Sequence, residues 1–171
     1  MAHRSLALVA LVLLAGCTRS EPPAVREVIL APSATAETKA PEASIWIRIE
    51  AAPAGGLPAR LKAEIGKAVQ KKLKPVVYIG ATWCKPCVAI KKYKKDPLML
   101  DALEGTYVID LDLDDWKAPD LTALGFNAGE VPHFYLVDGE GRSTGRTITS
   151  SVWKEDIPVN MAPKLKAFFS G

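Results

Sequence analysis

The sequence contains little cysteine, little histidine and little excess charge. Of its 171 residues three are cysteine and two are histidine, and the formal net charge is +3 at pH 7. A charge this close to neutral argues against nucleic acid as a partner. Cys84 and Cys87 form one Cys-x-x-Cys pair, and the sequence has no second such pair or histidine pair to complete a tetrahedral zinc site. We therefore expect no metal and no other cofactor.

Long hydrophobic runs are also absent. The apolar run Leu6–Leu14 has about nine residues, whereas a helix that spans a bilayer needs about 20. Because His3 and Arg4 precede this run, residues 1–16 have the pattern of a secretory signal peptide. We expect this segment to direct export rather than to span a membrane.

The end of that segment, Leu14-Ala15-Gly16-Cys17, resembles the lipobox of bacterial lipoproteins. In that family the chain is cut before the cysteine, which then carries lipid, so the resemblance implies that Cys17 attaches the protein to the lipid bilayer. The alternative is an ordinary secreted protein with a chance cysteine. The implied location is the bacterial cell envelope, facing the periplasm. Thr18 stands where an aspartate retains some lipoproteins in the inner membrane, so it favours the outer membrane.

Residues 17–43 are rich in proline, alanine, threonine, serine and glutamate. Such a composition does not bury a hydrophobic core. We expect a lipid-anchored flexible linker over these residues, followed by one domain over residues 44–171.

The predicted domain alternates strand and helix patterns. A continuous apolar run at 76–79 indicates a strand buried on both faces, and apolar residues repeated every four positions over 57–73 predict an amphipathic helix. Further strands are expected at 45–49, 107–113, 133–137 and 142–149, the last two joined as a hairpin. Further helices are expected after the cysteine pair with a break near Pro97, at 119–124, and near the C-terminus with Pro163 in its first turn. This order predicts an α/β fold: a central mixed β-sheet flanked by helices on both faces.

The cysteine pair lies where the buried strand ends and the next helix begins, in the motif Trp83-Cys84-Lys85-Pro86-Cys87. A cysteine at a helix N-terminus faces free backbone N–H groups and the positive end of the helix dipole, both of which favour the thiolate. The two intervening residues allow Cys87 to return to Cys84 and resolve a mixed disulfide. A static disulfide, or half of a metal site with His133, are the alternatives for this pair.

The motif after an apolar strand resembles the active site of the thioredoxin family, and Val131-Pro132 before the strand at 133–137 is a second mark of that family. The resemblance implies a thioredoxin fold, a redox disulfide between Cys84 and Cys87, Cys84 as nucleophile and Cys87 as resolving cysteine. It also implies supporting roles for Trp83, Pro86, Val131 and Pro132, with a cis bond before Pro132. We expect a supporting role for Lys85 as well, on the ground of its charge.

Two residues depart from the family pattern. Lys85 stands where glycine is common, and its charge would favour a thiolate at Cys84. Tyr78 stands six residues before Cys84, where many thioredoxins have a buried acid that helps to move the proton of the second thiol.

Two groups of charged residues have simpler interpretations. The lysines on the helix after the cysteines are expected to form a solvated face, and Asp110, Asp112 and Asp114 to form the polar side of a strand. The lysines are Lys91, Lys92, Lys94 and Lys95.

Together these features predict a membrane-anchored thiol–disulfide oxidoreductase that reduces disulfides of exported proteins. Its expected partners are protein disulfide substrates and a membrane electron donor of the thiol–disulfide relay type. The alternatives are a disulfide oxidase or isomerase, and a non-catalytic binding or metal-delivery module with the same fold.

Overall fold

The computed structural model describes residues 43–51 and 56–171, all of which belong to one compact unit, residues 39–171. The expected signal peptide, the lipidation site Cys17 and the linker up to residue 42 lie outside the described residues. In the part of the chain that is described, no helix is long and apolar enough to cross a bilayer.

A five-stranded mixed sheet forms the centre of the domain, in the order β1-β3-β2-β4-β5. The strands β1, β3 and β2 are parallel to one another, and β4 and β5 run antiparallel as a hairpin. Their bounds are β1 Ile45–Arg48, β2 Lys74–Gly80, β3 Thr106–Asp112, β4 His133–Val137 and β5 Ser143–Thr149. The predicted mixed sheet and its hairpin are confirmed.

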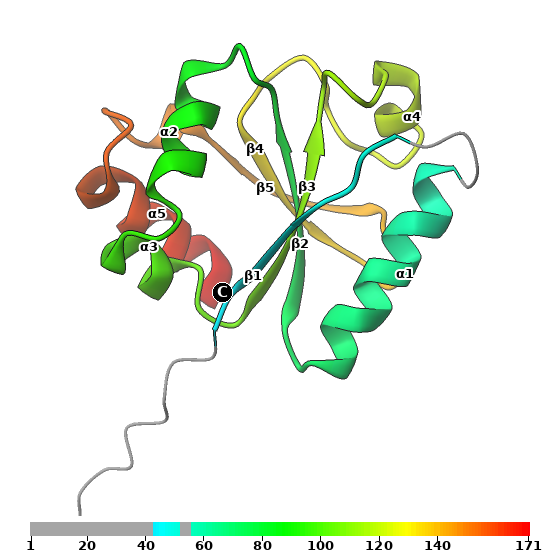
Figure 1. The fold of residues 1–171 in the computed structure, drawn as a ribbon, viewed down its shortest axis with the longest axis horizontal. Helices are drawn as coiled ribbons and strands as arrows, with labels where there is room; N and C mark the ends of the chain where they lie inside the picture. Colours follow the sequence, from blue (N-terminus) through cyan, green and yellow to red (C-terminus); the bar gives the residue numbers. More distant parts are fainter. Residues whose placement is uncertain (1–42, 52–55) are drawn as a thin grey trace, which may run out of the picture. The chain divides into compact units, whose positions relative to one another are not determined.

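Helices cover both faces of this sheet. Figure 1 shows α1 and α4 on one side, and α2, α3 and α5 on the other. Their bounds are α1 Leu57–Gln70, α2 Lys85–Tyr93, α3 Pro97–Ala102, α4 Ala118–Thr122 and α5 Pro158–Ser170, with a short 3-10 helix, Ser150–Val152, before α5. This arrangement is the thioredoxin fold, an α/β fold as predicted.

The helix after the cysteines breaks where we expected. Tyr93 ends α2, and α3 begins at Pro97, whose ring fixes φ and lacks the N–H that an interior helical residue would donate. The Asp96 side chain accepts a hydrogen bond from the Leu98 N–H at 2.9 Å and caps α3. The break lets α2 and α3 cover different parts of one sheet face.

The strand β2 is buried on both faces and separates two hydrophobic clusters. Val76 and Tyr78 face the cluster that contains both cysteines, while Val77 and Ile79 face the cluster beneath α1. The alternation follows from the two-residue period of a strand. β2 therefore places Tyr78 on the same side of the sheet as the cysteine-bearing helix.

The predicted apolar stripe of α1 is wrong at Val69, which is 64% exposed, whereas Ala68 is fully buried. Four residues advance a helix by about 400°, so a strict four-residue repeat drifts by about 40° at each step. By its fourth member the repeat has left the buried face. Leu73 is buried, but it lies beyond the end of α1.

The predicted place of Pro163 is also wrong. Pro158 occupies the first turn of α5, and Pro163 lies inside the helix. An interior proline removes one helical hydrogen bond, so packing must hold the helix together. Leu165 and Phe169, both buried against the sheet, provide that packing.

Candidate active site

The structure joins Cys84 and Cys87 by a disulfide at the N-terminus of α2. Cys84 is the N-cap residue, and its sulfur accepts a hydrogen bond from the Cys87 N–H at 3.2 Å. Cys87 is 0% exposed and Cys84 5% exposed. The two cysteines are therefore unequal: both are buried, but Cys84 keeps a slight exposure and Cys87 has none.

The setting of Cys84 favours a negative charge on its sulfur once the disulfide opens. The Cys87 N–H is one of the helix-start donors that have no partner within the helix, and the positive end of the α2 dipole points the same way. No acidic residue lies in the first turn of α2 to oppose this effect. Hydrogen bonding to the charged form and a helix N-terminus both stabilise a thiolate.

The loop before β4 brings a second segment to the disulfide. The Val131–Pro132 peptide bond is cis, and the Cys84 sulfur lies 3.6 Å from the carbonyl oxygen of Val131. Pro132 is buried, whereas Val131 is half-buried. The loop thus places the Val131 carbonyl group next to the Cys84 sulfur.

The remaining motif residues surround the sulfur at the surface. Trp83 is 67% exposed, and Val88, one turn beyond Cys84 on α2, is 50% exposed. Lys85 is also exposed, and Pro86 lies half-buried in the first turn of α2. Trp83 precedes Cys84 in the chain and the Val88 N–H bonds to the Cys84 carbonyl, so two exposed apolar side chains lie near the disulfide, a surface of the kind on which another protein can dock.

Asp114 fixes the turn that leads into the motif, a contact that the sequence did not predict. Its carboxylate accepts hydrogen bonds from the Thr82 N–H at 3.2 Å and the Thr82 hydroxyl at 2.5 Å. These bonds from Thr82, with a further one from Trp83, lower the pKa of Asp114. Asp114 comes just after β3, which runs parallel to β2, and this position is the sequence signal that could have indicated the contact.

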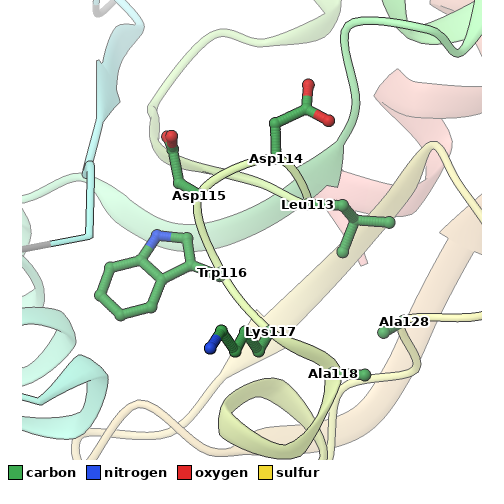
Figure 2. Close-up of a pocket in the computed structure, with 7 residues that line it drawn as sticks. All are labelled: Leu113, Asp114, Asp115, Trp116, Lys117, Ala118 and Ala128. Atoms are coloured by element: carbon green, nitrogen blue, oxygen red, sulfur yellow. The ribbon is translucent and has the colours of Figure 1, made fainter.

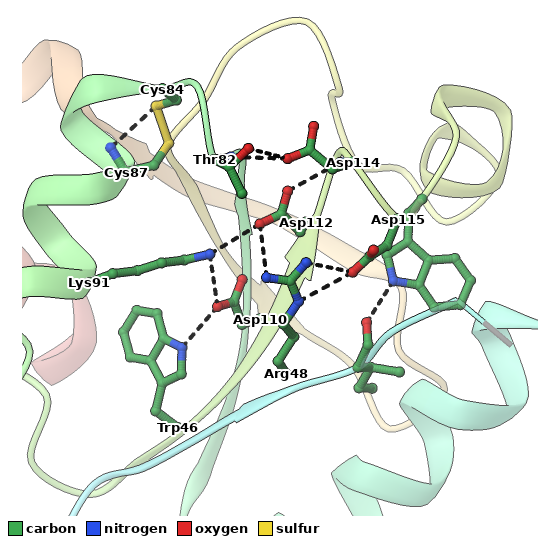
Figure 3. A network of polar contacts seen from close by, with 12 residues as sticks. Trp46, Arg48, Thr82, Cys84, Cys87, Lys91, Asp110, Asp112, Asp114 and Asp115 are labelled. Carbon is green, nitrogen blue, oxygen red and sulfur yellow. Dashed lines mark hydrogen bonds and ion pairs between the residues drawn. A yellow bond between two sulfur atoms is a disulfide. The ribbon is translucent and has the colours of Figure 1, made fainter.

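Below the disulfide, a cationic side chain from α2 meets two buried carboxylates from β3 (Figure 3). The Lys91 ammonium lies 3.2 Å from a carboxylate oxygen of Asp110 and 3.2 Å from one of Asp112. Lys91 is therefore not part of a solvated face, and the prediction for it is wrong. Asp110 and Asp112 do occupy one side of a strand, but α2 covers that side and buries both residues.

Tyr78 of β2 lies beside these groups, with the Lys91 ammonium 5.8 Å from the centroid of its ring. Its side chain is fully buried, and among the described residues its hydroxyl has no hydrogen-bond partner. Burial raises the pKa of Tyr78, and the carboxylates of Asp110 and Asp112 raise it further. The hydroxyl therefore stays protonated at physiological pH and can only donate or accept a hydrogen bond.

A hollow of about 400 Å³ lies next to the Thr82–Asp114 contact, between the end of β3 and α4 (Figure 2). Its polar lining consists of Asp114, Asp115 and Lys117, none of which is buried. Such a lining selects no particular ligand. Within the described residues, no group of three histidine, cysteine, aspartate or glutamate side chains could hold a metal ion.

Comparisons with known proteins give no family assignment. No protein-family model matches the chain, and no curated protein matches it. Among solved structures, a chain from the complex of ferredoxin:thioredoxin reductase with thioredoxin f2 is 15% identical, with a TM-score of 0.45, covering 73% of this chain and 94% of that chain. Thioredoxin O1 from Arabidopsis thaliana is 19% identical, with a TM-score of 0.36, covering 63% and 86%. Schistosoma mansoni thioredoxin is 24% identical, with a TM-score of 0.39, covering 60% and 87%.

Proposed function

We propose that the chain is a membrane-anchored thiol–disulfide oxidoreductase that reduces disulfides of exported proteins through a Cys84/Cys87 dithiol–disulfide cycle. One observation carries the proposal: the two sulfurs are bonded at a helix start, with Cys84 slightly exposed, at 5%, and Cys87 fully buried. A purely structural bridge over so short a loop would restrict the unfolded chain little. The inequality of the two sulfurs suits a division into attacking and resolving thiols.

The cycle begins with the dithiol form. The Cys84 thiolate attacks one sulfur of a substrate disulfide, forms a mixed disulfide with it, and the other substrate sulfur leaves with the electron pair. Cys87 then loses its proton and attacks the Cys84 sulfur. The second substrate sulfur leaves, and the products are a reduced substrate and the Cys84–Cys87 disulfide.

The surface around Cys84 is suited to an extended segment of a protein substrate. The Val131 carbonyl, close to the Cys84 sulfur, can accept a hydrogen bond from a substrate backbone N–H. Trp83 and Val88, both exposed, offer apolar contacts near Cys84. Backbone pairing with adjacent apolar contacts binds segments of many sequences, as a general disulfide reductase requires.

The residues between the cysteines bear on the direction of electron flow. Reducing members of the thioredoxin family also have proline between the cysteines, so Pro86 supports reduction. A membrane electron donor of the relay type would then restore the dithiol. Lys85 supports the alternative of an oxidase or isomerase, because a cation near the thiolate would stabilise the dithiol form. In this proposal Cys17 carries the lipid anchor and the domain faces the periplasm.

The redox equilibrium of the cysteine pair with glutathione tests the direction. A reductase should have a potential near about −270 mV, as thioredoxin has, and a value near about −120 mV would contradict the reducing assignment. The oxidised and reduced fractions can be separated by alkylation of the free thiols followed by gel electrophoresis.

Trapping experiments test the catalytic role. A Cys87→Ser variant should accumulate mixed disulfides with exported proteins, and a Cys84→Ser variant should not. Equal accumulation in both variants, or biological activity that survives Cys84→Ser, would instead favour a non-catalytic binding module. Cys17→Ala should release the protein from the membrane fraction without changing its redox potential.

A further inference from the structure

The Val131 carbonyl, which the function proposed above assigns to substrate binding, belongs to the loop between α4 and β4. Its oxygen lies 3.6 Å from the Cys84 sulfur. Among the described residues, no backbone–backbone hydrogen bond involves residues 127–131 of this loop. The position of the carbonyl therefore depends on side chains that hold the loop in place.

One hydroxyl group joins the two ends of this loop. The Tyr135 hydroxyl oxygen accepts a hydrogen bond from the Asn127 N–H at 2.9 Å and lies 2.8 Å from Nδ1 of His133. Asn127 comes before Val131 in the chain, and His133 comes after it. The hydroxyl therefore closes the base of the loop that carries the Val131 carbonyl.

The single hydrogen of the Tyr135 hydroxyl has a preferred acceptor. Nδ1 of His133 lies 2.8 Å from the hydroxyl oxygen, whereas the Asn127 carbonyl oxygen lies 3.3 Å away. Nδ1 accepts only when the ring is neutral and carries its proton on Nε2. Burial lowers the pKa of His133, so the ring is neutral at physiological pH. The hydroxyl thus accepts from one end of the loop and donates to the other.

The Tyr135 side chain is itself held firmly. It is 2% exposed, and its ring packs against Phe126 and His133, with centroids 5.0 and 4.2 Å away. Because this ring stands on β4, the hydroxyl ties the loop to the central sheet. The Asn127 side chain also accepts a hydrogen bond from the Gly129 N–H at 2.8 Å, which shapes the start of the loop.

We propose that Tyr135 and His133 are positioning residues, whose hydrogen-bonded pair fixes the loop so that the Val131 carbonyl can bind a substrate backbone beside Cys84. The proposal rests on the function proposed above and adds no chemical step to its cycle. Both side chains act through the loop and not on the reacting sulfurs.

A positioning role of this kind should appear in substrate binding. Without the tie at its base, the loop would have to be ordered when a substrate binds, and that ordering lowers affinity. A small disulfide without a peptide backbone makes no hydrogen bond to the Val131 carbonyl. Loss of the tie should therefore weaken the binding of peptides and leave the attack on a small disulfide unchanged.

The test compares two disulfide reagents on the full reduced chain. One is a short peptide whose single cysteine is joined to 5-thio-2-nitrobenzoate, and the other is 5,5′-dithiobis(2-nitrobenzoate). Both release a coloured thiolate when Cys84 attacks, but only the peptide has backbone N–H groups. All variants carry Cys17→Ala, so Cys84 and Cys87 are the only thiols. The half-saturating peptide concentration reports binding, and the limiting rate reports attack.

Tyr107→Phe is the matched control, because it removes another hydroxyl from a buried tyrosine. Tyr107 is 3% exposed, and its hydroxyl donates to a Glu64 carboxylate oxygen at 2.7 Å. It pairs with Pro75 near the start of β2, whereas the cysteines follow the end of that strand. The control thus has the same chemistry at a place remote from the loop.

Tyr135→Phe should raise the half-saturating peptide concentration about three- to tenfold, the effect of about one net hydrogen bond. Its limiting rate, and its rate with the small disulfide, should stay within about twofold of the wild type, and Tyr107→Phe should change none of the three values. His133→Leu should also raise the concentration. His133→Asn should restore it, because asparagine can place an oxygen where Nδ1 accepts. The His133 pair of variants keeps the test valid if Tyr135→Phe does not fold.

Three results would overturn the proposal. They are an unchanged half-saturating concentration in Tyr135→Phe, an equal rise in Tyr107→Phe, and equal values for His133→Leu and His133→Asn. Slowing of both reagents by the same factor in Tyr135→Phe would show a merely structural role and would overturn it too. Failure of the cycle itself gives a different result: a Cys84→Ser variant would then release the coloured thiolate as fast as the wild type.

Discussion

Gly80 ends β2 beneath the motif, and we expect Gly80→Ala to destabilise the domain because of one neighbouring ring. A Cβ atom at this position would lie 2.7 Å from the Tyr78 Cε1 and hydroxyl oxygen and 2.9 Å from Cζ. Unstrained contacts between carbon atoms are about 3.5–4.0 Å, so the ring would have to move by about 1 Å. The two residues share one face of the strand, since side chains alternate along it.

The Tyr78 ring has no free space into which to move. It is 0% exposed and packs against Trp46 and Phe134, with ring centroids 5.1 and 4.8 Å away. Overpacking of this kind lowers the free energy of unfolding by about 1–3 kcal/mol. Alanine has less conformational freedom than glycine in the unfolded chain, which raises the free energy of unfolding by about 0.4–1 kcal/mol. We expect a net loss of about 1–1.5 kcal/mol of unfolding free energy, or about 3–8 °C in Tm for a domain of this size.

Urea unfolding of the oxidised protein, followed by tryptophan fluorescence, measures this loss in the wild type, Gly80→Ala, Tyr78→Val and the double variant. If the Tyr78 ring causes the clash, Gly80→Ala should cost little in a Tyr78→Val background, with a coupling energy of about 2 kcal/mol between the two positions. Gly66→Ala is the matched control. Gly66 lies inside α1 with nothing within 4 Å of its added Cβ, so alanine there should stabilise the domain by up to about 1 kcal/mol. A Gly80→Ala cost that is absent, or equal in both Tyr78 backgrounds, would refute the reasoning.

Two further predictions concern titratable groups. Burial lowers the pKa of His133 below its ordinary 6.5, so the unfolded state binds its proton first and stability should fall as pH drops from about 7 through 6.5 and below. His133→Asn should remove this part of the pH dependence in urea unfolding, and unchanged slopes would contradict it. Hydrogen bonds from Thr82 lower the pKa of Asp114, so its carboxylate holds the turn at neutral pH and releases it in acid. Asp114→Ala should slow the attack of reduced Cys84 on 5,5′-dithiobis(2-nitrobenzoate) a few-fold, measured as the first release of coloured thiolate, whereas Asp120→Asn, at an exposed position of α4, should not.

The architecture was predictable from the sequence because each signal was local. The apolar run of β2 marks a strand buried on both faces, and all four of its predicted core residues are 0% exposed. Pro97 marks a helix break because of its own covalent geometry, and the Asp138–Gly141 turn joins two alternating strands. The predictions for Val69 and Pro163 were wrong because these positions depend on helix geometry and tertiary packing, which a short stretch of sequence does not determine.

The disulfide and the cis bond before Pro132 were also expected from the sequence, because its motifs resemble those of the thioredoxin family. The polar contacts around them were not predictable from the sequence. Thr82 and Asp114 are 32 residues apart, and Lys91 and Asp112 are 21 apart. Such pairs meet only because β3 lies beside β2 in the sheet, and strand order is a property of the whole chain.

Tyr78 shows most clearly why a residue-by-residue comparison with a family misleads. Judged by position alone, a tyrosine in place of a buried acid removes a proton acceptor from β2. In the folded chain the strand position opposite Tyr78 on β3 is Asp110, so a buried carboxylate stands one strand away from the expected place. The lysine that compensates it comes from the cysteine-bearing helix itself, four residues after Cys87. A substitution that appears to remove a chemical group can therefore leave that group in the same buried layer, supplied by a neighbouring strand, and only sheet register reveals it.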